Sequence, residues 1–317
     1  MRIVLLEPLA IDEEKLNLLS LKLKNKGHEF IYYNTRTEEK NELIKRAAGA
    51  QVVILSNIPF TGEIINACPE LKMISVAFTG VDHIDMQACR QRGIVVCNAA
   101  GYSTHSVAEL TFGLILSVMR KVIECNAATR AGGTKNGLIG NEIFGKTLGI
   151  VGTGAIGLRV AEIGKAFGLK ILAYSRSQKE SAINMGISYV DLDTLLSESD
   201  IVTLHVPLTA ETKGMINEER IAKMKPGSIL INTARGSIVD SAALARALCE
   251  HRIAGAGVDV FEMEPPLPKD HVLFSAPNVV LTPHVAFATR EAFERRAKIV
   301  FDNILLWLEG RPQNVMN

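Results

Sequence analysis

Two glycine-rich patterns that could bind a nucleotide lie end to end in GNEIFGKTLGIVGTGAIG, residues 140–157. The first, G-x-x-x-x-G-K-T over residues 140–147, is the P-loop pattern, whose backbone N–H groups hold a nucleoside triphosphate for phosphoryl transfer. The second, G-x-G-x-x-G, is formed by Gly152, Gly154 and Gly157 and is the fingerprint of a dinucleotide site used for hydride transfer. The two patterns predict different chemistry, and their surroundings decide between them.

The P-loop interpretation fails because a working P-loop follows a strand and begins a helix at its Lys-Thr pair. Residues 128–139 are polar and glycine-rich, and the residues after Thr147 are an apolar, strand-like run. A helix there would have to contain Gly149, Gly152 and Gly154, each costing about 1 kcal/mol relative to Ala. We therefore reject phosphoryl transfer.

The dinucleotide fingerprint has the surroundings it needs, since KTLGIVG predicts a strand and residues 155–167 a helix. Gly152 permits the tight turn, Gly154 lets the backbone approach a pyrophosphate, and Gly157 permits close packing of the helix on the strand. The free N–H groups at the helix N-terminus favour phosphate. The candidate phosphate ligands are the three glycines and the first helical residues, Ala155 and Ile156. The alternative is an ordinary glycine turn.

The end of the next strand, KILAYS, indicates which dinucleotide binds. NAD sites have a carboxylate there that binds the ribose hydroxyls, but this sequence has Ser175, Arg176 and Ser177. A guanidinium forms a planar, charge-assisted fork with phosphate oxygens and so suits the 2′-phosphate of NADP. We predict NADP, with NAD as the alternative if Arg176 is only a solvated loop residue.

Composition excludes several other functions. The formal net charge is +1, with 35 Lys and Arg against 34 Asp and Glu, so we expect a small-molecule ligand and no nucleic acid partner. The five cysteines never form C-x-x-C, and we expect neither disulfides nor a metal site. The N-terminus does not resemble a signal peptide, and the apolar stretch 108–119 contains Glu109 and is too short to span a membrane. We expect a cytoplasmic protein without a membrane partner.

The pattern of elements predicts two α/β domains. Five short apolar runs, interrupted by several helical stretches, precede Asn98, and six more begin at Leu148: LGIVG, KILAYS, DIVTLHVP, SILINTA, AGAGVDV and NVVLTPH. Apolar runs alternating with helices are typical of parallel sheets covered on both faces. The chain ends with a predicted amphipathic helix over 289–308.

Five segments carry a family resemblance: NAAGYSTHSVAEL (98–110), HVPLTAET (205–212), LINTARGSIVD (230–240), GVDVFEMEPP (257–266) and LTPHVAFAT (281–289). Together with the fingerprint they resemble the D-isomer-specific 2-hydroxyacid dehydrogenase family, and most closely its glyoxylate/hydroxypyruvate reductase-like members. The resemblance implies an α/β fold of two doubly wound domains. A flavodoxin-like substrate domain would comprise 1–98 and 288–317, and an inserted Rossmann NAD(P)-binding domain 99–287.

The resemblance also implies hydride transfer between NAD(P)H and a small 2-keto or D-2-hydroxy acid, running in the reductive direction. His284 would be the general acid/base, Glu264 would hydrogen-bond its other ring nitrogen, and Arg235 would bind the substrate carboxylate. Taken singly, each residue has a structural alternative: a strand cap for His284, loop solvation for Glu264 and an ion pair for Arg235.

Further residues follow from the same resemblance. The turn Phe78-Thr79-Gly80 would bind the substrate carboxylate through backbone N–H groups, and Asp259 would bind the nicotinamide carboxamide. The remaining expected cofactor ligands, besides His284, are Val107, Val206, Pro207, Thr212, Thr233 and Ala234. We expect His83 and His205 to be structural.

Departures from the family pattern limit the substrate. The loop SNIPFTGE, residues 56–63, has no basic residue for a phosphate, and few residues follow the last helix, so we expect neither a phosphorylated substrate nor a regulatory domain. Phe60, Phe78 and Phe287 suggest a small or apolar side chain on the acid. We expect a homodimer, through the helix at 106–119 and the segment after it, unless that helix is buried within its own domain. The alternative function is a dinucleotide-sensing, corepressor-like protein with little turnover.

Overall fold

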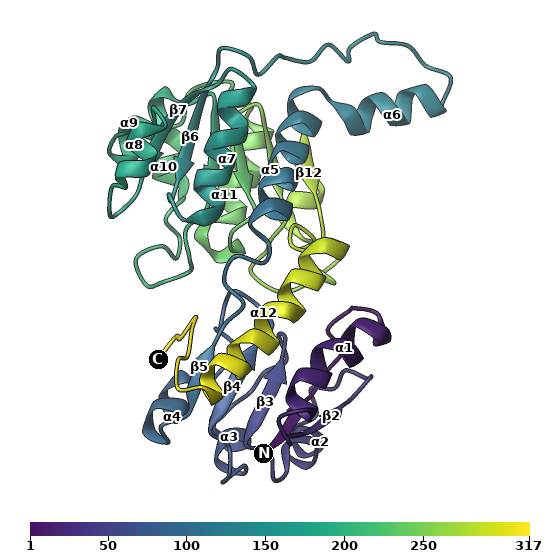
Figure 1. The fold of residues 1–317 in the computed structure, drawn as a ribbon. Coiled ribbons are helices and arrows are strands. Elements are labelled where there is room, and N and C mark those ends of the chain that lie inside the picture. Colours follow the sequence, from purple (N-terminus) through teal and green to yellow (C-terminus); the bar gives the residue numbers. More distant parts are fainter. The chain divides into compact units, whose positions relative to one another are not determined.

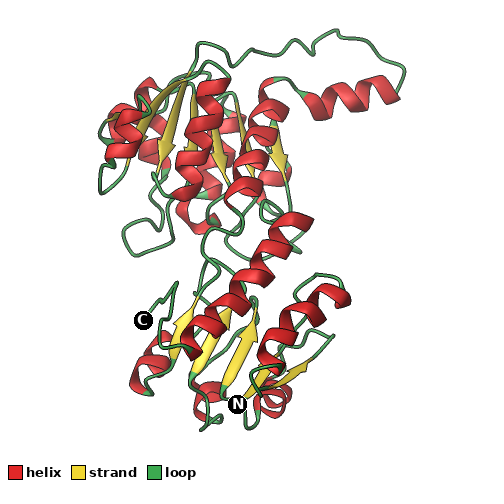
Figure 2. Ribbon diagram, in the orientation of Figure 1, coloured by secondary structure: helices red, strands yellow, loops and turns green.

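The computed structural model describes all residues, 1–317, and its contacts divide the chain into two compact units (Figures 1 and 2). One unit comprises 1–103 and 288–317, and the other comprises 104–287. The sequence predicted the first division after residue 98 instead of Ser103. The difference arises because the intervening loop is bonded inside the first unit: Asn303 Nδ2 donates to Asn98 O at 2.8 Å, and Arg295 Nε donates to Tyr102 O at 3.0 Å.

The first unit is built on a five-stranded parallel sheet of order β2-β1-β3-β4-β5, the flavodoxin-like order. Its strands are β1 Arg2–Leu5, β2 Glu29–Tyr32, β3 Val52–Leu55, β4 Met73–Val76 and β5 Val95–Cys97. Its helices are α1 Glu13–Lys24, α2 Lys40–Ala47, α3 Gly62–Asn66, α4 Met86–Gln91 and α12 Arg290–Leu308. Every residue of β3 and β4 is buried, as expected of continuous apolar runs in a parallel sheet.

The C-terminal residues complete the first unit. Thr289 caps α12 by accepting a hydrogen bond from Ala292 N at 3.1 Å. The helix then lies over β4, where Ser75 Oγ donates to Val300 O at 3.1 Å (Figure 1). Beyond it, Met316 N donates to Val96 O at 2.9 Å, so the last residues cover the exposed edge of β5.

The second unit contains a seven-stranded parallel sheet of order β12-β11-β10-β9-β6-β7-β8. Its strands are β6 Thr147–Val151, β7 Lys170–Tyr174, β8 Ser188–Tyr189, β9 Ile201–Leu204, β10 Ile229–Asn232, β11 Gly255–Val258 and β12 Val279–Leu281. This is the Rossmann order with one added strand, β12. The sequence predicted six strands and missed β8, because a strand of two residues, one of them Ser, has no apolar run.

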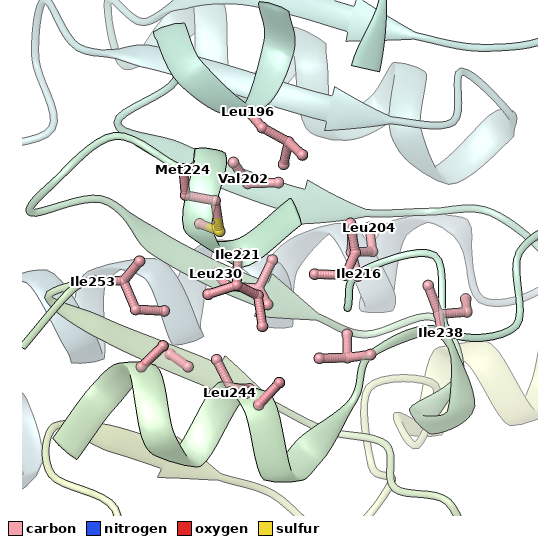
Figure 3. Close-up of a cluster of buried hydrophobic side chains, with 14 of the residues drawn as sticks. Leu196, Val202, Leu204, Ile216, Ile221, Met224, Leu230, Ile238, Leu244 and Ile253 are labelled. Atoms are coloured by element: carbon pink, nitrogen blue, oxygen red, sulfur yellow. The ribbon is translucent and has the colours of Figure 1, made fainter. Parts of the chain in front are cut away.

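Helices cover both faces of this sheet (Figure 2). They are α5 Thr104–Met119, α6 Val122–Arg130, α7 Ala155–Ala166, α8 Glu180–Asn184, α9 Leu192–Glu198, α10 Glu218–Lys223 and α11 Ser241–Cys249, with 3-10 turns at Gly236–Ile238 and Val272–Phe274. Figure 3 shows one of its hydrophobic cores, in which Leu244 of α11 lies over Leu230 of β10 and Ile253. A second core, which includes Ala108 and Ile115 of α5, lies against α7.

The packing of α5 bears on the predicted dimer. Ala108, Leu114 and Ile115 are buried, and the helix packs on α7 and β11 of its own unit. It is therefore a core helix, the alternative that the sequence left open. In contrast, α6 has no buried residue, and Figure 1 shows it extending away from the sheet of its unit together with the long loop that follows. None of the helices is both long and apolar enough to cross a membrane.

Candidate active site

The three predicted catalytic residues lie in the loops that follow three adjacent strands. Arg235 follows β10, Glu264 follows β11 and His284 follows β12, and the sheet order places these strands side by side and parallel. The carboxyl ends of neighbouring parallel strands meet at one edge of the sheet, where doubly wound folds bind their ligands. The fold therefore brings all three loops to the same edge.

Glu264 and His284 form a direct contact. The two carboxylate oxygens lie 3.0 and 2.9 Å from His284 Nδ1. The imidazole side chain is 17% exposed and the carboxylate 69%. Phe287 packs edge-on against the imidazole, with ring centroids 5.3 Å apart. This arrangement fixes the ring orientation and places a carboxylate directly against Nδ1.

A buried carboxylate holds the loop that carries His284. Asp259 is 0% exposed and accepts hydrogen bonds from Thr282 Oγ1 at 2.6 Å, Val285 N at 2.9 Å and Ala286 N at 3.0 Å. Its main-chain oxygen also accepts from His284 N at 2.8 Å. His284 has φ 55°, an uncommon value for a residue with a side chain. These bonds stabilise that conformation, a role of Asp259 that the sequence did not predict.

The Arg235 loop is held by a second buried polar residue. Asn232, 2% exposed, accepts from Ala234 N and donates to Arg235 O, both at 3.0 Å. Gly236 lies so close to Phe261 that a Cβ at this position would overlap the Phe261 carbonyl group. The loops that carry Arg235 and Glu264 are therefore packed against each other.

Two of the predicted nicotinamide ligands lie beside this loop. Thr233 Oγ1 is 3.2 Å from Thr111 Oγ1 of α5, and Thr111 donates to Val107 O at 2.8 Å. Thr233 and Val107 are therefore close in space, and both are buried. The sequence did not single out Asn232 or Thr111, since a lone polar residue in an apolar segment has no local pattern.

The three fingerprint glycines have the geometry that a pyrophosphate site requires. Gly152 has φ 103°, and a Cβ there would lie 2.6 Å from the His205 carbonyl oxygen. A Cβ on Gly157 would overlap the Gly152 carbonyl oxygen, whereas one on Gly154 would meet nothing within 4 Å. Ala155 and Ile156 begin α7 next to this open space, and no side chain caps the helix. The residues thus fit a dinucleotide phosphate.

A pocket of about 270 Å³ extends from this turn along the ends of β7 and β9. It contains many of the predicted cofactor residues: Gly152, Gly154, Ser175, Arg176, Ser177, Val206, Pro207 and Thr212. It also contains residues absent from the predicted set: Thr153, Tyr174, Lys179, His205, Thr209, Glu211 and Met215. Of these, Thr153 could have been found from its position between two fingerprint glycines.

The charges in this pocket have both signs. Arg176 and Lys179 belong to the loop after β7, and Glu211 belongs to the loop after β9. A hydrogen bond from the Thr209 hydroxyl lowers the pKa of Glu211, and the charge of Arg176 lowers it further. Glu211 is therefore a carboxylate near Arg176, a feature that the sequence did not reveal.

His205 lines the pocket but lacks the properties of an acid/base catalyst. Burial of its ring lowers its pKa to about 3, and Nε2 lies 3.0 Å from Thr203 Oγ1. The imidazole is neutral at physiological pH.

The turn predicted to bind the substrate carboxylate lies in the first unit, directly after β4. Thr79 is exposed, whereas Phe78 and Gly80 are half-buried. Asn98 Nδ2 donates to Thr79 O at 2.7 Å and holds the turn in place. Phe60, expected near the pocket, is instead 0% exposed in the core of its unit. It belongs to the packing and does not shape a substrate side-chain pocket.

Comparison with known proteins shows the family of the chain. Residues 112–286 match the model of the D-isomer specific 2-hydroxyacid dehydrogenase NAD binding domain. The chain belongs to this family. It is 45% identical over 265 residues to a glyoxylate reductase of Thermococcus litoralis, with 80% of each chain covered. It is also 44% identical over 260 residues to a hydroxypyruvate reductase of Thermotoga maritima, covering 81% of this chain and 84% of the relative.

Its fold matches that of an acyclic imino acid reductase, Bsp5, solved with NADPH and D-Arg, with a TM-score of 0.89, 32% identity and full coverage of both chains. The chain is thus an NAD(P)-dependent D-2-hydroxyacid dehydrogenase, an α/β protein with two parallel sheets. No group of three or more His, Cys, Asp or Glu side chains in this dehydrogenase is arranged to hold a metal ion.

Proposed function

We propose that this dehydrogenase reduces a small, unphosphorylated 2-keto acid, glyoxylate or hydroxypyruvate, to the D-2-hydroxy acid. The observation that carries the proposal is the contact between Glu264 and His284 Nδ1 at 2.9 Å, at the same sheet edge as Arg235. A keto-acid reductase needs a proton donor for the carbonyl oxygen and a cation for the carboxylate, and these residues supply both.

In the proposed mechanism, Arg235 binds the keto-acid carboxylate and polarises the adjacent carbonyl group. His284 donates the proton on Nε2 to the carbonyl oxygen as that oxygen becomes negative. Glu264, bound to Nδ1, keeps the ring oriented and stabilises its protonated form until transfer. A bound nicotinamide dinucleotide supplies the hydride.

The other site residues are assigned in the same way. Backbone N–H groups of Thr79 and Gly80 would bind the substrate carboxylate beside Phe78. Gly152, Gly154, Ala155, Ile156 and Gly157 would hold the pyrophosphate. The nicotinamide and ribose ligands would be Val107, Val206, Pro207, Thr212, Thr233, Ala234 and Asp259. The carboxylate of Asp259 already accepts three hydrogen bonds from the His284 loop, which leaves little capacity for a carboxamide.

We propose NADPH as the preferred reductant. The end of β7 has Ser175, Arg176 and Ser177 in place of a carboxylate, and all three line the pocket. A guanidinium beside two hydroxyls suits the 2′-phosphate better than it suits a ribose diol. Glu211 opposes this preference through its negative charge, so we expect discrimination but not exclusion of NADH.

The proposed catalytic role can be tested with a matched pair of variants. His284 and His251 both have positive φ, 55° and 53°, a conformation that Asn tolerates. His284→Asn should lower kcat for glyoxylate with NADPH by about a thousand-fold while leaving the Kd of NADPH nearly unchanged. His251→Asn, at an exposed position, should retain the wild-type rate. Wild-type protein that binds NADPH tightly but turns over neither keto acid would instead indicate a dinucleotide sensor.

The cofactor preference has its own test. Arg176→Met should raise the KM for NADPH by about ten-fold and leave the KM for NADH nearly unchanged. Arg159→Met is the control, since Arg159 pairs with Glu162 on the surface of α7. Equal effects of Arg176→Met on both reductants would refute the assignment of Arg176 to the 2′-phosphate.

We also propose that the dehydrogenase is a homodimer through α6 and the segment after it. Four large apolar side chains there are exposed, at 46% for Val122, 56% for Ile123, 84% for Ile139 and 76% for Phe144. Such a concentration of apolar surface is typical of an interface. Light scattering should give twice the chain mass for the wild type and a lower mass for Ile139→Glu. A monomeric wild type would contradict this proposal.

A further inference from the structure

Glu7 is a buried carboxylate in the first unit that the catalytic chemistry does not use. It follows β1, is 3% exposed, and has hydrogen-bond partners for both of its oxygens. We propose that Glu7 is a positioning residue for keto-acid binding. It fixes the loop after β3, residues 56–60, which is hydrogen-bonded to the segment that follows the substrate turn, residues 81–85. The proposal rests on the proposed function of the turn Phe78-Thr79-Gly80.

Glu7 holds the loop after β3 through its carboxylate. Glu7 Oε1 accepts hydrogen bonds from three successive backbone N–H groups: Ser56 at 2.7 Å, Asn57 at 3.1 Å and Ile58 at 3.3 Å. Successive N–H groups that converge in this way form an anion-binding nest. The chain's own carboxylate fills the nest and fixes the backbone of residues 56–58.

Arg36 completes the cluster from the opposite side. Its Nη1 donates to Glu7 Oε2 at 2.7 Å and to Asn57 Oδ1 at 2.6 Å. Arg36 thus compensates the buried charge and also binds the loop itself. A buried carboxylate with this many charge-assisted donors strongly favours one loop conformation.

Backbone hydrogen bonds link this loop to the segment that follows the substrate turn. Phe60 N donates to His83 O at 2.8 Å, and Asp85 N donates to Phe60 O at 3.2 Å, forming a short parallel bridge between Phe60 and Ile84. Ile84 N in turn donates to Val81 O at 3.0 Å, one residue beyond Gly80. Glu7 is therefore linked to the end of the substrate turn by two sets of hydrogen bonds, which the backbone of Pro59 joins between Ile58 and Phe60.

The loop held by Glu7 also bears on substrate choice. Its three N–H groups and Nη1 of Arg36 are donors that could bind an anion, and Glu7 accepts from all four. A phosphate on the substrate would find these donors occupied. The cluster is thus consistent with the preference proposed for an unphosphorylated keto acid.

The test compares variants that loosen this cluster with one that loosens another part of the same unit. Glu7→Gln removes the charge at nearly constant shape, and Arg36→Met removes the cation from a side chain that is 43% exposed. Arg92→Met is the control. Arg92 donates to the carbonyl oxygens of Ile65, Cys68 and Pro69, none of which lies in residues 56–60 or 78–84. Each protein is assayed for kcat, for KM with glyoxylate and hydroxypyruvate, for the Kd of NADPH and for amide hydrogen exchange.

We expect Glu7→Gln and Arg36→Met to raise the KM for both keto acids by about five- to ten-fold, since charge-assisted hydrogen bonds at the loop are lost. Amide exchange should accelerate at residues 56–60 and 78–84. The kcat should change by less than about two-fold, because substrate binding is weakened without loss of an interaction specific to the transition state. The Kd of NADPH should not change, since the dinucleotide site lies in the other unit.

Two results would overturn the proposal: unchanged exchange at 78–84 in Glu7→Gln, or accelerated exchange with an unchanged KM. A general loss of stability is also distinguishable, because Arg92→Met would then raise the KM equally. A wild-type protein that reduces neither keto acid would contradict the proposed function itself, and the positioning role would fall with it.

Discussion

The carboxylate of Glu264 lies 2.9 Å from Nδ1 of His284, although 20 residues separate them in the chain. The two side chains meet because they follow adjacent parallel strands, β11 and β12. The contact holds the imidazole through Nδ1, which is the arrangement expected of an oriented acid/base group.

Replacing Glu264 by Gln should therefore slow the chemistry more than it weakens binding. We expect Glu264→Gln to lower kcat for glyoxylate reduction by about a hundred-fold, because an amide cannot stabilise the imidazolium as a carboxylate does. The KM for NADPH should stay within about two-fold. Steady-state kinetics at neutral pH measures both. Glu262→Gln, two residues away in the same loop, is the control, and an equal loss in that variant would argue against a specific role of Glu264.

Asp259 gives the second prediction. Its carboxylate accepts from Thr282 Oγ1, Val285 N and Ala286 N, and an Asn side chain could accept from only part of this set. We expect Asp259→Asn to reduce the free energy of unfolding by about 1–3 kcal/mol and to reduce kcat as well, because His284 loses its fixed backbone. Denaturant unfolding and kinetics on the same samples test this. Unchanged stability with weaker cofactor binding would instead favour the carboxamide role predicted from the sequence.

The fingerprint glycines give a third prediction, which separates folding from binding. A Cβ on Gly157 would overlap the Gly152 carbonyl oxygen, whereas a Cβ on Gly154 would meet no protein atom within 4 Å. Gly157→Ala should therefore lower the melting temperature markedly. Gly154→Ala should leave it nearly unchanged but weaken dinucleotide binding, since its methyl group would occupy space meant for the pyrophosphate. Thermal unfolding with and without NADPH distinguishes the two, and tight NADPH binding by Gly154→Ala would contradict the assignment of this turn to the phosphates.

Much of this architecture follows from local sequence patterns. The fingerprint, its flanking strand and its helix lie within one continuous segment, so their pattern predicted β6 and α7, and two doubly wound sheets are confirmed. Regular apolar runs also predicted strands whose ends carry Arg235, Glu264 and His284. What could not be predicted are features that depend on residues far apart in the sequence.

Glu7 illustrates the limit. Its partners Arg36 and Ser56 are 29 and 49 residues away, and no spacing within one element connects them. The same holds for Phe60, whose apolar side chain suits a substrate pocket as well as it suits a core. Its burial depends on how the loop after β3 packs on neighbouring segments, and the structure assigns it to the core. Strand β8 was missed for a different reason, because two residues are too short for any periodic signal.

His205 gives a prediction about pH and stability. Burial lowers its pKa to about 3 in the folded protein, whereas an unfolded chain has a His pKa of about 6.5. Between these values the unfolded state binds the additional proton, so the stability contributed by the neutral ring is present above about pH 6.5 and is lost as the pH falls toward 3. His205→Gln removes this titration but also the contact with Thr203 Oγ1. We expect the variant to be less stable than wild type at pH 7.5 and to lose less of its melting temperature on acidification to pH 4.5. His251→Gln, at an exposed position, should instead follow the wild type at both pH values. If the melting temperatures of wild type and His205→Gln fall in parallel, the ring of His205 is not held neutral by burial.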